Sequence, residues 1–359
     1  MISLHNGDLD VLLHEPSDGY YQGTRFDRSG VFGGIRFRGV ELCDQWFERY
    51  DPFMHDAVLG PAEEFTPQFL SFSGNTLKQS ELSVGVPGKA PELAFLPDID
   101  SCGAISSTPT RTTVLKDSDN LILKIGVGLL KPDGQPYDRF RRYEIIDPGE
   151  WSMEQEGDDV RYRHTLRGYY IYNKEVRVLS GNSFEISHEL TACDVPLKGE
   201  VYNHNFFTLG LLSVGPGREI TFPCPVTGDW RAQYDSIALA PEGFRFSRTL
   251  QKGESVYMGN IRAKDVLPSR SKCFPPEKRS ENTSPTPAKD VFCGTPYEFI
   301  LRETGLAGII PTVHVRGNVP ITHSVMWSNH RIACFEPYNA YDIGPGESFR
   351  WIIRYALSL

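Results

Sequence analysis

The chain has 359 residues, a formal net charge of −9 and an aromatic content of 12%, with 33 Gly and 26 Pro. This length allows a large core, either as two domains of ordinary size or as one large all-β unit. The acidic balance, without any block of Lys and Arg, disfavours nucleic acid and anionic membranes as partners. Abundant aromatic, Gly and Pro residues are typical of many strands joined by tight turns.

The first residues contain neither the basic nor the apolar segment of a secretory signal, and no apolar run approaches the length of a membrane span. The seven cysteines are scattered and include no Cys-x-x-Cys pair, which disfavours a zinc knuckle or a redox motif. We therefore expect reduced, mostly structural thiols in a cytoplasmic protein.

In the first half of the chain, residues 41–50 are expected to form a short helical turn. Residues 121–130 are almost continuously apolar, as in a buried strand, and Gly126 and Gly128 within them indicate the close approach of another backbone. Alternating apolar and polar residues predict further strands, at residues 160–166 and 183–190.

In the second half, residues 264–290 are rich in Pro and Ser and are predicted to form a surface loop. A short helical turn is expected at residues 286–292. Residues 348–359 alternate most clearly and predict the last strand. Because strands of one style lie on both sides of the loop, we expect a single domain over residues 1–359, a large antiparallel β-sandwich with few short helices.

The first candidate for chemistry is His204, in the strand-like segment 201–209 that reads Val-Tyr-Asn-His-Asn-Phe-Phe-Thr-Leu. A sheet surface can fix the orientation of an imidazole and partly desolvate it, and an imidazole titrates close to neutral pH. A lone histidine on a strand is more often a core residue than a catalyst. His204 becomes a stronger catalytic candidate only if a second ionisable side chain lies beside it.

That partner is Glu336, which follows an apolar run and precedes Pro337. A carboxylate at the end of a buried strand can point into a cleft with a raised pKa. Taken alone, it is more often an edge carboxylate that caps a turn, since most carboxylates are solvated. If the strands of His204 and Glu336 converge on one concave face, an acid and a base would face each other over a small polar substrate.

These segments resemble the galactose mutarotase (aldose 1-epimerase) family. Residues 203–209 are similar to its Asn-His-Ser-Tyr-Phe-Asn-Leu motif. The segment around Glu336, followed by Pro-Gly-Glu at 345–347 and an aromatic last strand, looks like the end of that family, where a Cys-Leu-Glu-Thr-Gln stretch carries the catalytic carboxylate. The resemblance extends over at least residues 160–359 and implies the mutarotase-like supersandwich fold.

The resemblance implies that His204 protonates the ring oxygen of a sugar and that Glu336 removes the proton of the anomeric hydroxyl. The ring then opens, the C1–C2 bond rotates, and the roles reverse on closure. No cofactor is implied. Thr208 and Tyr338 stand where the family has Asn and Gln, so the substrate need not be free galactose.

Further substrate-binding candidates follow from the resemblance in the looser N-terminal half. Arg25 corresponds to an arginine that reaches the sugar, with a surface salt bridge as the alternative. His55 could be the first active-site histidine of the family, although the His-Gly-Gly context is absent. Asn203 flanks His204, and Asp235 is a weak substitute for an aspartate that grips sugar hydroxyls.

Trp327 could stack on a pyranose face, although core packing is the commoner role of a tryptophan. Arg331 could bind a carboxylate or phosphate on a substituted sugar, or be an exposed sheet charge. The histidines at 314, 323 and 330 fit no metal-ligand spacing, and no metal is expected.

The expected function is therefore interconversion of the α and β anomers of an aldose or modified sugar, by a monomer or homodimer. Two alternatives remain open at this stage. One is a carbohydrate-binding protein without catalysis. The other is a lyase or hydrolase acting on an oligosaccharide, since fold does not dictate function, and a hydrolase would need a second carboxylate facing Glu336, from Asp27, Asp56 or Glu64.

Overall fold

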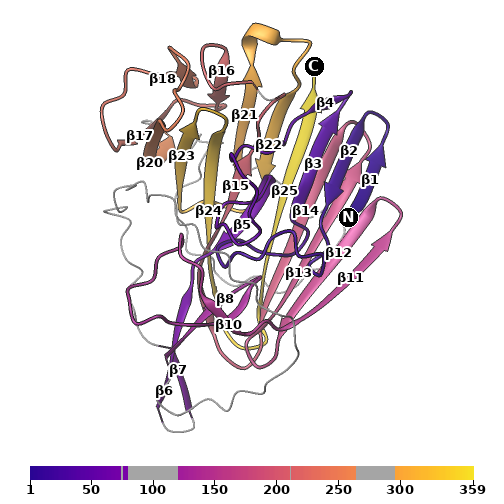
Figure 1. Cartoon of the computed structure of the whole chain (residues 1–359), viewed down its shortest axis with the longest axis vertical. Helices are drawn as coiled ribbons and strands as arrows, with labels where there is room; N and C mark the ends of the chain where they lie inside the picture. The colour runs from indigo at the N-terminus through magenta and orange to yellow at the C-terminus, as the bar shows by residue number, and fades with distance from the viewer. Residues whose placement is uncertain (74–75, 80–119, 211, 264–295) are drawn as a thin grey trace.

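The computed structural model describes residues 1–73, 76–79, 120–210, 212–263 and 296–359, which form an all-β protein (Figure 1). Every strand pairing within these residues is antiparallel, as expected, and the helical structure in them is one 3-10 turn, η1 (Thr304–Leu306). Within the described part of the chain, no helix is long and apolar enough to span a membrane.

Two sheets form the sandwich. The larger has the order β11 (Glu150–Glu156), β12 (Asp159–Leu166), β13 (Tyr170–Leu179), β14 (Ser183–Ala192), β25 (Ser348–Ser358), β22 (Thr312–Gly317), β21 (Tyr297–Glu303), β16 (Arg218–Thr221), β19 (Gly243–Phe246), β18 (Ile237–Ala240). The second has the order β17 (Val226–Trp230), β20 (Ser255–Ala263), β23 (His323–Asn329), β24 (Ala333–Ile343), β15 (Leu197–Phe206), β5 (Gly60–Phe65). We call them the ten-stranded and the six-stranded sheet.

Two smaller sheets complete the described fold. One contains β1 (Ile2–Asn6), β2 (Leu9–Leu13), β3 (Phe32–Phe37) and β4 (Val40–Glu41) in that order. The other has the order β10 (Glu144–Asp147), β9 (Gly128–Lys131), β8 (Asn120–Lys124), β6 (Gln68–Ser73), β7 (Thr76–Gln79). A bridge between Phe32 and Leu59 joins the β1–β4 sheet to the segment that enters β5.

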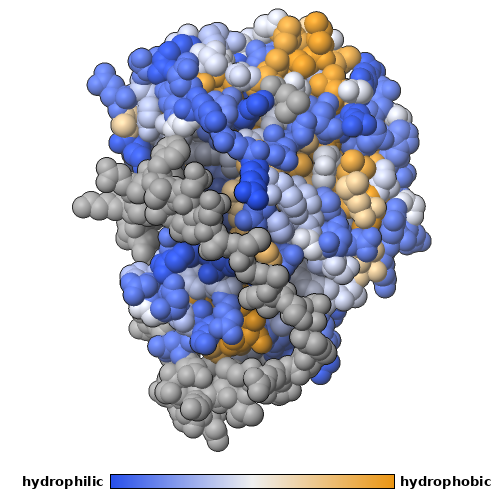
Figure 2. Space-filling model, viewed as in Figure 1, coloured by the Kyte–Doolittle hydropathy of each residue, from blue (hydrophilic) through white to orange (hydrophobic). Residues whose placement is uncertain are grey.

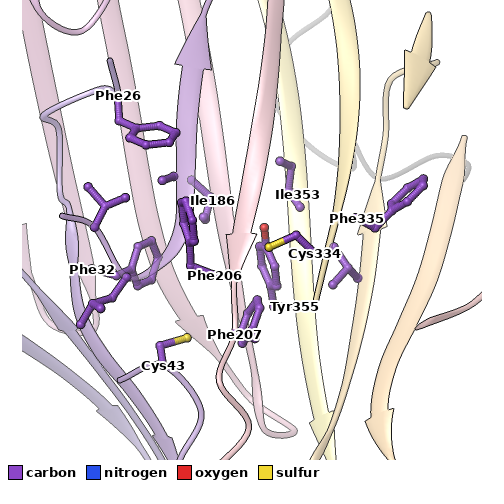
Figure 3. Close-up of a cluster of buried hydrophobic side chains, with 14 of the residues drawn as sticks. Phe26, Phe32, Cys43, Ile186, Phe206, Phe207, Cys334, Phe335, Ile353 and Tyr355 are labelled. Carbon is purple, nitrogen blue, oxygen red and sulfur yellow. The ribbon is translucent and has the colours of Figure 1, made fainter. Parts of the chain in front are cut away.

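Aromatic side chains between the two large sheets form the centre of the core. Phe65 of β5 lies 5.2 Å from Tyr172 and 6.0 Å from Trp351, both of the ten-stranded sheet, measured between ring centroids. Phe335 of β24 lies 4.9 Å from Phe299 of β21. Figure 3 shows part of this layer. Such edge-to-face pairs contribute about 0.5–1.5 kcal/mol each beyond the area they bury.

On the face in Figure 2 hydrophilic residues predominate, and an apolar area lies at the top, where Figure 1 places η1. Leu306 and Ile309 are exposed in that region. The alternating burial along β12 and β13 shows how one face of each strand meets the core while the other meets solvent.

Most predicted elements are confirmed, since β12, β14 and β25 cover residues 160–166, 183–190 and nearly all of 348–359. The prediction of one strand over residues 121–130 is wrong, because the chain turns between β8 and β9. Gly126 has a φ of +76° in that turn, and a Cβ there would collide with Asp27. The expected close approach at Gly126 and Gly128 is thus confirmed, with Asp147 as the neighbour of Gly128.

The helical turn expected at residues 41–50 is absent, because the chain there runs through bends and irregular backbone after β4. Its backbone bonds go to other segments, from Leu42 to Ile35 and from Thr208 to Leu42. The loop predicted at 264–290 and the turn at 286–292 lie outside the described residues.

The expectation of reduced cysteines is correct for Cys43, Cys193 and Cys334. It is wrong for Cys224, which is disulfide-bonded.

Candidate active site

The central feature of the six-stranded sheet is a place where β15 and β24 separate. The two strands pair from Leu197 and Ile343 as far as Tyr202 and Tyr338. The next pair in this register would be Asn203 and Pro337, and proline has no N–H to donate to a ladder. Beyond this point β15 pairs with β5, and β24 pairs with β23.

His204 and Glu336 face each other across this separation, one position beyond Pro337. Nε2 of His204 lies 3.1 Å from Oε1 of Glu336. Both residues are buried, with 4% and 5% of their surface exposed. The structure therefore brings the two predicted catalytic residues into direct contact.

Aromatic rings fix the orientation of the imidazole. The His204 ring stacks on Phe206 with centroids 3.7 Å apart and planes 5° apart. Trp327 and Phe26 stand edge-on to it at 5.6 Å and 6.1 Å. Within the described residues, Nδ1 of His204 is buried and makes no hydrogen bond, so it is the Nε2 contact with Glu336 that engages the ring.

Burial shifts the pKa values of the two groups in opposite directions. Desolvation lowers the pKa of His204 well below its usual value, and the cation of Arg25 lowers it further. Desolvation raises the pKa of Glu336 to about 8, against the attraction of Arg25 and Arg139. The charged form of each group is disfavoured in a low dielectric. At neutral pH these shifts favour the pair in which both groups are uncharged, with the carboxyl proton of Glu336 facing Nε2 of His204.

Arg25 lies beside the couple in a buried ion cluster. Its Nε donates to Oε2 of Glu64 at 2.7 Å, its Nη2 donates to the Tyr202 hydroxyl at 2.9 Å, and its Nη1 pairs with Asp56. Glu64 and Tyr202 project from β5 and β15 onto the same sheet face as His204. Arg25 forms salt bridges, as the alternative interpretation expected. They do not lie at the surface, since 6% of the residue is exposed.

Two further cations complete this cluster. Nε of Arg139 and Nζ of Lys124 each lie 3.5 Å from Oε1 of Glu64. Burial alone would raise the pKa of Glu64, but Arg139, Arg25 and Lys124 hold it well below its usual value. The cluster thus keeps fixed positive charge next to the couple, which disfavours the imidazolium form of His204.

His55 joins the cluster at its rim. Its Nε2 lies 3.1 Å from Oδ2 of Asp56, and its side chain is 34% exposed. The ring is edge-on to Phe140 at 5.1 Å. His55 is therefore one residue removed from Arg25 and remains accessible to a solute.

Further aromatic residues cover the same sheet face. Tyr202 and Tyr338 stack with centroids 4.4 Å apart. Trp46 stacks on Phe206 at 5.1 Å and stands edge-on to Trp327 at 6.0 Å. We call Trp46, Tyr202, Trp327 and Tyr338 the aromatic wall. Trp46 and Trp327 are only partly buried, which leaves ring surface for a ligand.

Three predicted binding residues are not brought to this face. Asn203 points to the opposite side of β15, where its Nδ2 donates to Glu63 at 2.9 Å, because neighbouring residues of a strand alternate in direction. Asp235 is exposed and pairs with Arg248 at 2.5 Å. Arg331 lies in the turn before β24, where it lines a hollow of about 250 Å³ with residues that include Trp46.

Sequence reasoning missed Tyr202, Arg139 and Lys124 as site residues. Tyr202 could have been found, since it lies two positions before His204 on one strand and must share its face. Lys124 interrupts the apolar run at 121–130, which predicts only a buried strand. Arg139 reaches Glu64 from a segment with no periodic or motif signal. In the part of the chain that the structure describes, no group of three or more His, Cys, Asp and Glu residues is arranged to hold a metal ion.

No protein-family model and no curated protein matches this sequence. Solved structures do match it. The Slr1438 protein of Synechocystis sp. PCC 6803 has a TM-score of 0.50 and 12% identity, over 99% of this chain and 95% of that chain. At this identity the likeness concerns the fold alone, and it extends over nearly the whole of both chains.

Two other matching structures have lower scores. A putative aldose 1-epimerase from Klebsiella pneumoniae has a TM-score of 0.43 and 10% identity, over 99% of this chain and 78% of that chain. A GalM/aldose epimerase homologue from C. elegans has a TM-score of 0.35 and 12% identity, over 64% of this chain and 77% of that chain.

Proposed function

We propose that the protein is an isomerase that interconverts the α and β anomers of an aldose or a modified sugar. The observation that carries this proposal is the couple of His204 and Glu336, 3.1 Å apart where two strands separate. An acid and a base with pKa values displaced in opposite directions are the groups that sugar ring opening requires.

The neutral couple can perform the reaction without a cofactor. Glu336 gives its proton to the ring oxygen as the bond between that oxygen and C1 breaks, while His204 takes the proton of the anomeric hydroxyl. After rotation about C1–C2, both protons return as the ring closes. The roles of acid and base are thus the reverse of those that the family resemblance implies, because in this proposal the resting proton is on Glu336. Each group contributes roughly 10²–10⁴-fold.

The surroundings suit a sugar as substrate. Trp46 and Trp327, the partly exposed members of the aromatic wall, offer ring faces for stacking on a pyranose. We infer that His55, exposed at the rim of the cluster, contacts hydroxyl groups of the sugar, and that Arg25 acts beside the couple through its ion pairs. Arg331 lines the hollow beside Trp46, so it could receive a more distant group of a larger or charged sugar.

The test is magnetisation exchange between the anomeric protons of each sugar, measured by NMR over a panel with neutral, phosphorylated and acidic aldoses. Glu336→Gln and His204→Ala should each lower the exchange rate at least about 100-fold. Glu200→Gln is the matched control, because Glu200 also pairs with a histidine of this sheet, His323, at 3.4 Å. Full activity in Glu336→Gln would exclude the proposal.

A carbohydrate-binding protein without catalysis is the second candidate, and the aromatic wall is the observation that favours it. It would bind sugar equally in the wild type and in Glu336→Gln, with no acceleration of anomer exchange in either. A hydrolase is less well supported, because the carboxylates that could assist Glu336 are already ion-paired. Asp56 and Glu64 pair with Arg25, and Asp27 pairs with Lys174.

A further inference from the structure

Directly behind the couple, between the two large sheets, lies a buried polar cluster that the proposed chemistry does not use. Its members come from both sheets and from the loop before β3, and each is no more than 4% exposed. We call it the rear cluster, which consists of Asp27, Glu63, Lys174, His188, Asn203, Asn205 and Tyr355.

Charged groups form one half of the rear cluster. Lys174 of β13 pairs with Glu63 and lies 3.4 Å from Oδ2 of Asp27. Nε2 of His188 lies 3.1 Å from Oε1 of Glu63, and Nδ2 of Asn203 donates to the same oxygen at 2.9 Å. Buried charges with this many partners are strongly held, since breaking one pair leaves the other charge uncompensated.

Amides and a hydroxyl form the other half and reach the catalytic strands. The Tyr355 hydroxyl lies 2.7 Å from Oδ1 of Asn203 and 2.9 Å from Oδ1 of Asn205. Nδ2 of Asn205 donates to the carbonyl of Phe335 at 2.8 Å. Phe335 immediately precedes Glu336, so hydrogen bonds continue from Glu63 to the residue beside the catalytic carboxylate.

These bonds cross the separation of β15 and β24, where backbone pairing has ended. The Asn205 side chain takes the place of a ladder hydrogen bond there, and the thiol of Cys334 adds a contact of 3.0 Å to the Asn205 carbonyl. Without such links, nothing in the ladder would set the distance between His204 and Glu336.

The rear cluster also holds the loop that carries Arg25. The Asp27 backbone N–H donates to the Glu63 carbonyl at 2.9 Å. Oδ1 of Asp27 accepts from the Ser29 backbone N–H at 2.9 Å and from its hydroxyl at 2.7 Å. Arg25 and Phe26, two residues and one residue earlier, then lie against the front of the sheet beside His204.

We propose that the rear cluster is the positioning device of the couple: it fixes the separation of β15 and β24 and the orientation of His204 relative to Glu336. Its catalytic consequence rests on the proposed anomerase function. Its members are positioning residues, because they act from the reverse face through the strands and the loop.

The test compares two Tyr→Phe variants in the same core. Tyr355→Phe removes the hydroxyl that joins Asn203 to Asn205. Tyr297→Phe is the matched control, since Tyr297 is buried and its hydroxyl makes no hydrogen bond within the described residues. We expect Tyr355→Phe to lower kcat for anomer exchange about tenfold with KM within about twofold, the loss of roughly one hydrogen bond. Tyr297→Phe should change neither.

A second readout does not depend on activity. The ring nitrogens of His204, labelled with ¹⁵N, report its protonation and tautomer over a pH titration. Tyr355→Phe should move the His204 titration toward the ordinary value, and Tyr297→Phe should not. Asn205→Ser, which removes the donor to Phe335, should act in the same direction as Tyr355→Phe.

The outcomes separate the two proposals. If the wild type accelerates no anomer exchange, the function fails, but a His204 titration moved only by Tyr355→Phe and Asn205→Ser still supports positioning. If neither variant moves the titration or kcat relative to Tyr297→Phe, the rear cluster is structural only and the inference is overturned, whatever the loss of thermal stability.

Discussion

A carboxyl group and an imidazole in contact normally share a proton as an ion pair, but at the His204–Glu336 couple burial works against both charges. Burial of His204 among aromatic rings makes the imidazolium costly, and two cations of the adjoining cluster, Arg25 and Arg139, add to that cost. The same burial raises the pKa of Glu336. The couple is therefore held in the form that can give and take a proton without first being charged.

This state has a consequence for stability. The pKa of Glu336 is raised from 4.5 to about 8 in the folded protein, so the folded state binds an extra proton between these values. Stability therefore falls as pH rises through this window, because a carboxylate must be ionised inside the protein. Glu336→Gln should be more stable than the wild type at pH 9, by an order of a few kcal/mol, and nearly equal to it at pH 4.5.

The measurement is urea unfolding of both proteins from pH 4.5 to 9. Glu200→Gln provides a control of opposite sign. Burial would raise the pKa of Glu200, but the hydrogen bond from His323 holds it below its usual value. Glu200→Gln should therefore lose stability at high pH. A Glu336→Gln curve parallel to that of the wild type would show that Glu336 is ionised at neutral pH.

At the scale of the strand, Pro337 determines where the site can form. The Thr322 N–H donates to the Tyr338 carbonyl, so the backbone of Tyr338 faces β23. The alternation of backbone direction along a strand then turns the Pro337 backbone toward β15. Its missing N–H ends the ladder on that side, and His204 and Glu336 occupy the position after Pro337, the second beyond the last pair.

Pro337→Ala supplies an N–H toward β15 and should extend the ladder by one pair. The hydrogen bond contributes about 0.5–1.5 kcal/mol, and the extra freedom of the unfolded chain costs about 0.4–1 kcal/mol, so net stability should change little. Activity should fall about tenfold, because a strand shift of a fraction of an ångström misplaces the couple.

Amide hydrogen exchange at position 337 tests this directly, and anomer exchange is measured on the same sample. The new amide should be strongly protected. Pro345→Ala, in the exposed turn between β24 and β25, should leave the anomer exchange rate unchanged. An unprotected amide at position 337, together with full activity, would contradict this account of the strand separation.

The same strands show what a sequence can predict. Alternation identified β12, β14 and β25, and the motif residues identified His204 and Glu336, because both signals are local. Asn203 was assigned to the substrate because it adjoins His204, but adjacency on a strand places it on the opposite face. The continuous apolar run at 121–130 hid a hairpin, since burial on both faces removes the alternation that would mark each strand.

At the scale of the whole molecule, the site combines segments that are far apart in the chain. His204 and Glu336 meet because β15 and β24 are neighbours in one sheet, and Arg25, Asp56 and Arg139 join the site from segments outside the strands. Single-sequence patterns carry no information on such neighbours. The approach of Arg139 and Lys124 to Glu64 therefore could not be predicted, whereas the proximity of His204 and Glu336 could, through the resemblance to a family with known motifs.

The last strand, β25, connects the two parts of the ten-stranded sheet. It pairs with β14 on one side and with β22 on the other. Trp351 on this strand stacks on His188 at 4.3 Å and lies 6.0 Å from Phe65 of the opposite sheet. A defect at this residue should therefore weaken both sheets and their packing together.

Trp351→Ala should destabilise the protein by about 3–5 kcal/mol, since it leaves a cavity the size of an indole in the core. Trp151→Ala is the matched control, because Trp151 lies partly exposed on the edge strand β11, stacked on His164, and its loss should cost much less.

Urea unfolding followed by far-ultraviolet circular dichroism and by NMR gives both values. If β25 unites the fold, the two probes will show one shared transition for Trp351→Ala at a lower midpoint. Separate transitions would instead show that the two parts of the ten-stranded sheet unfold independently.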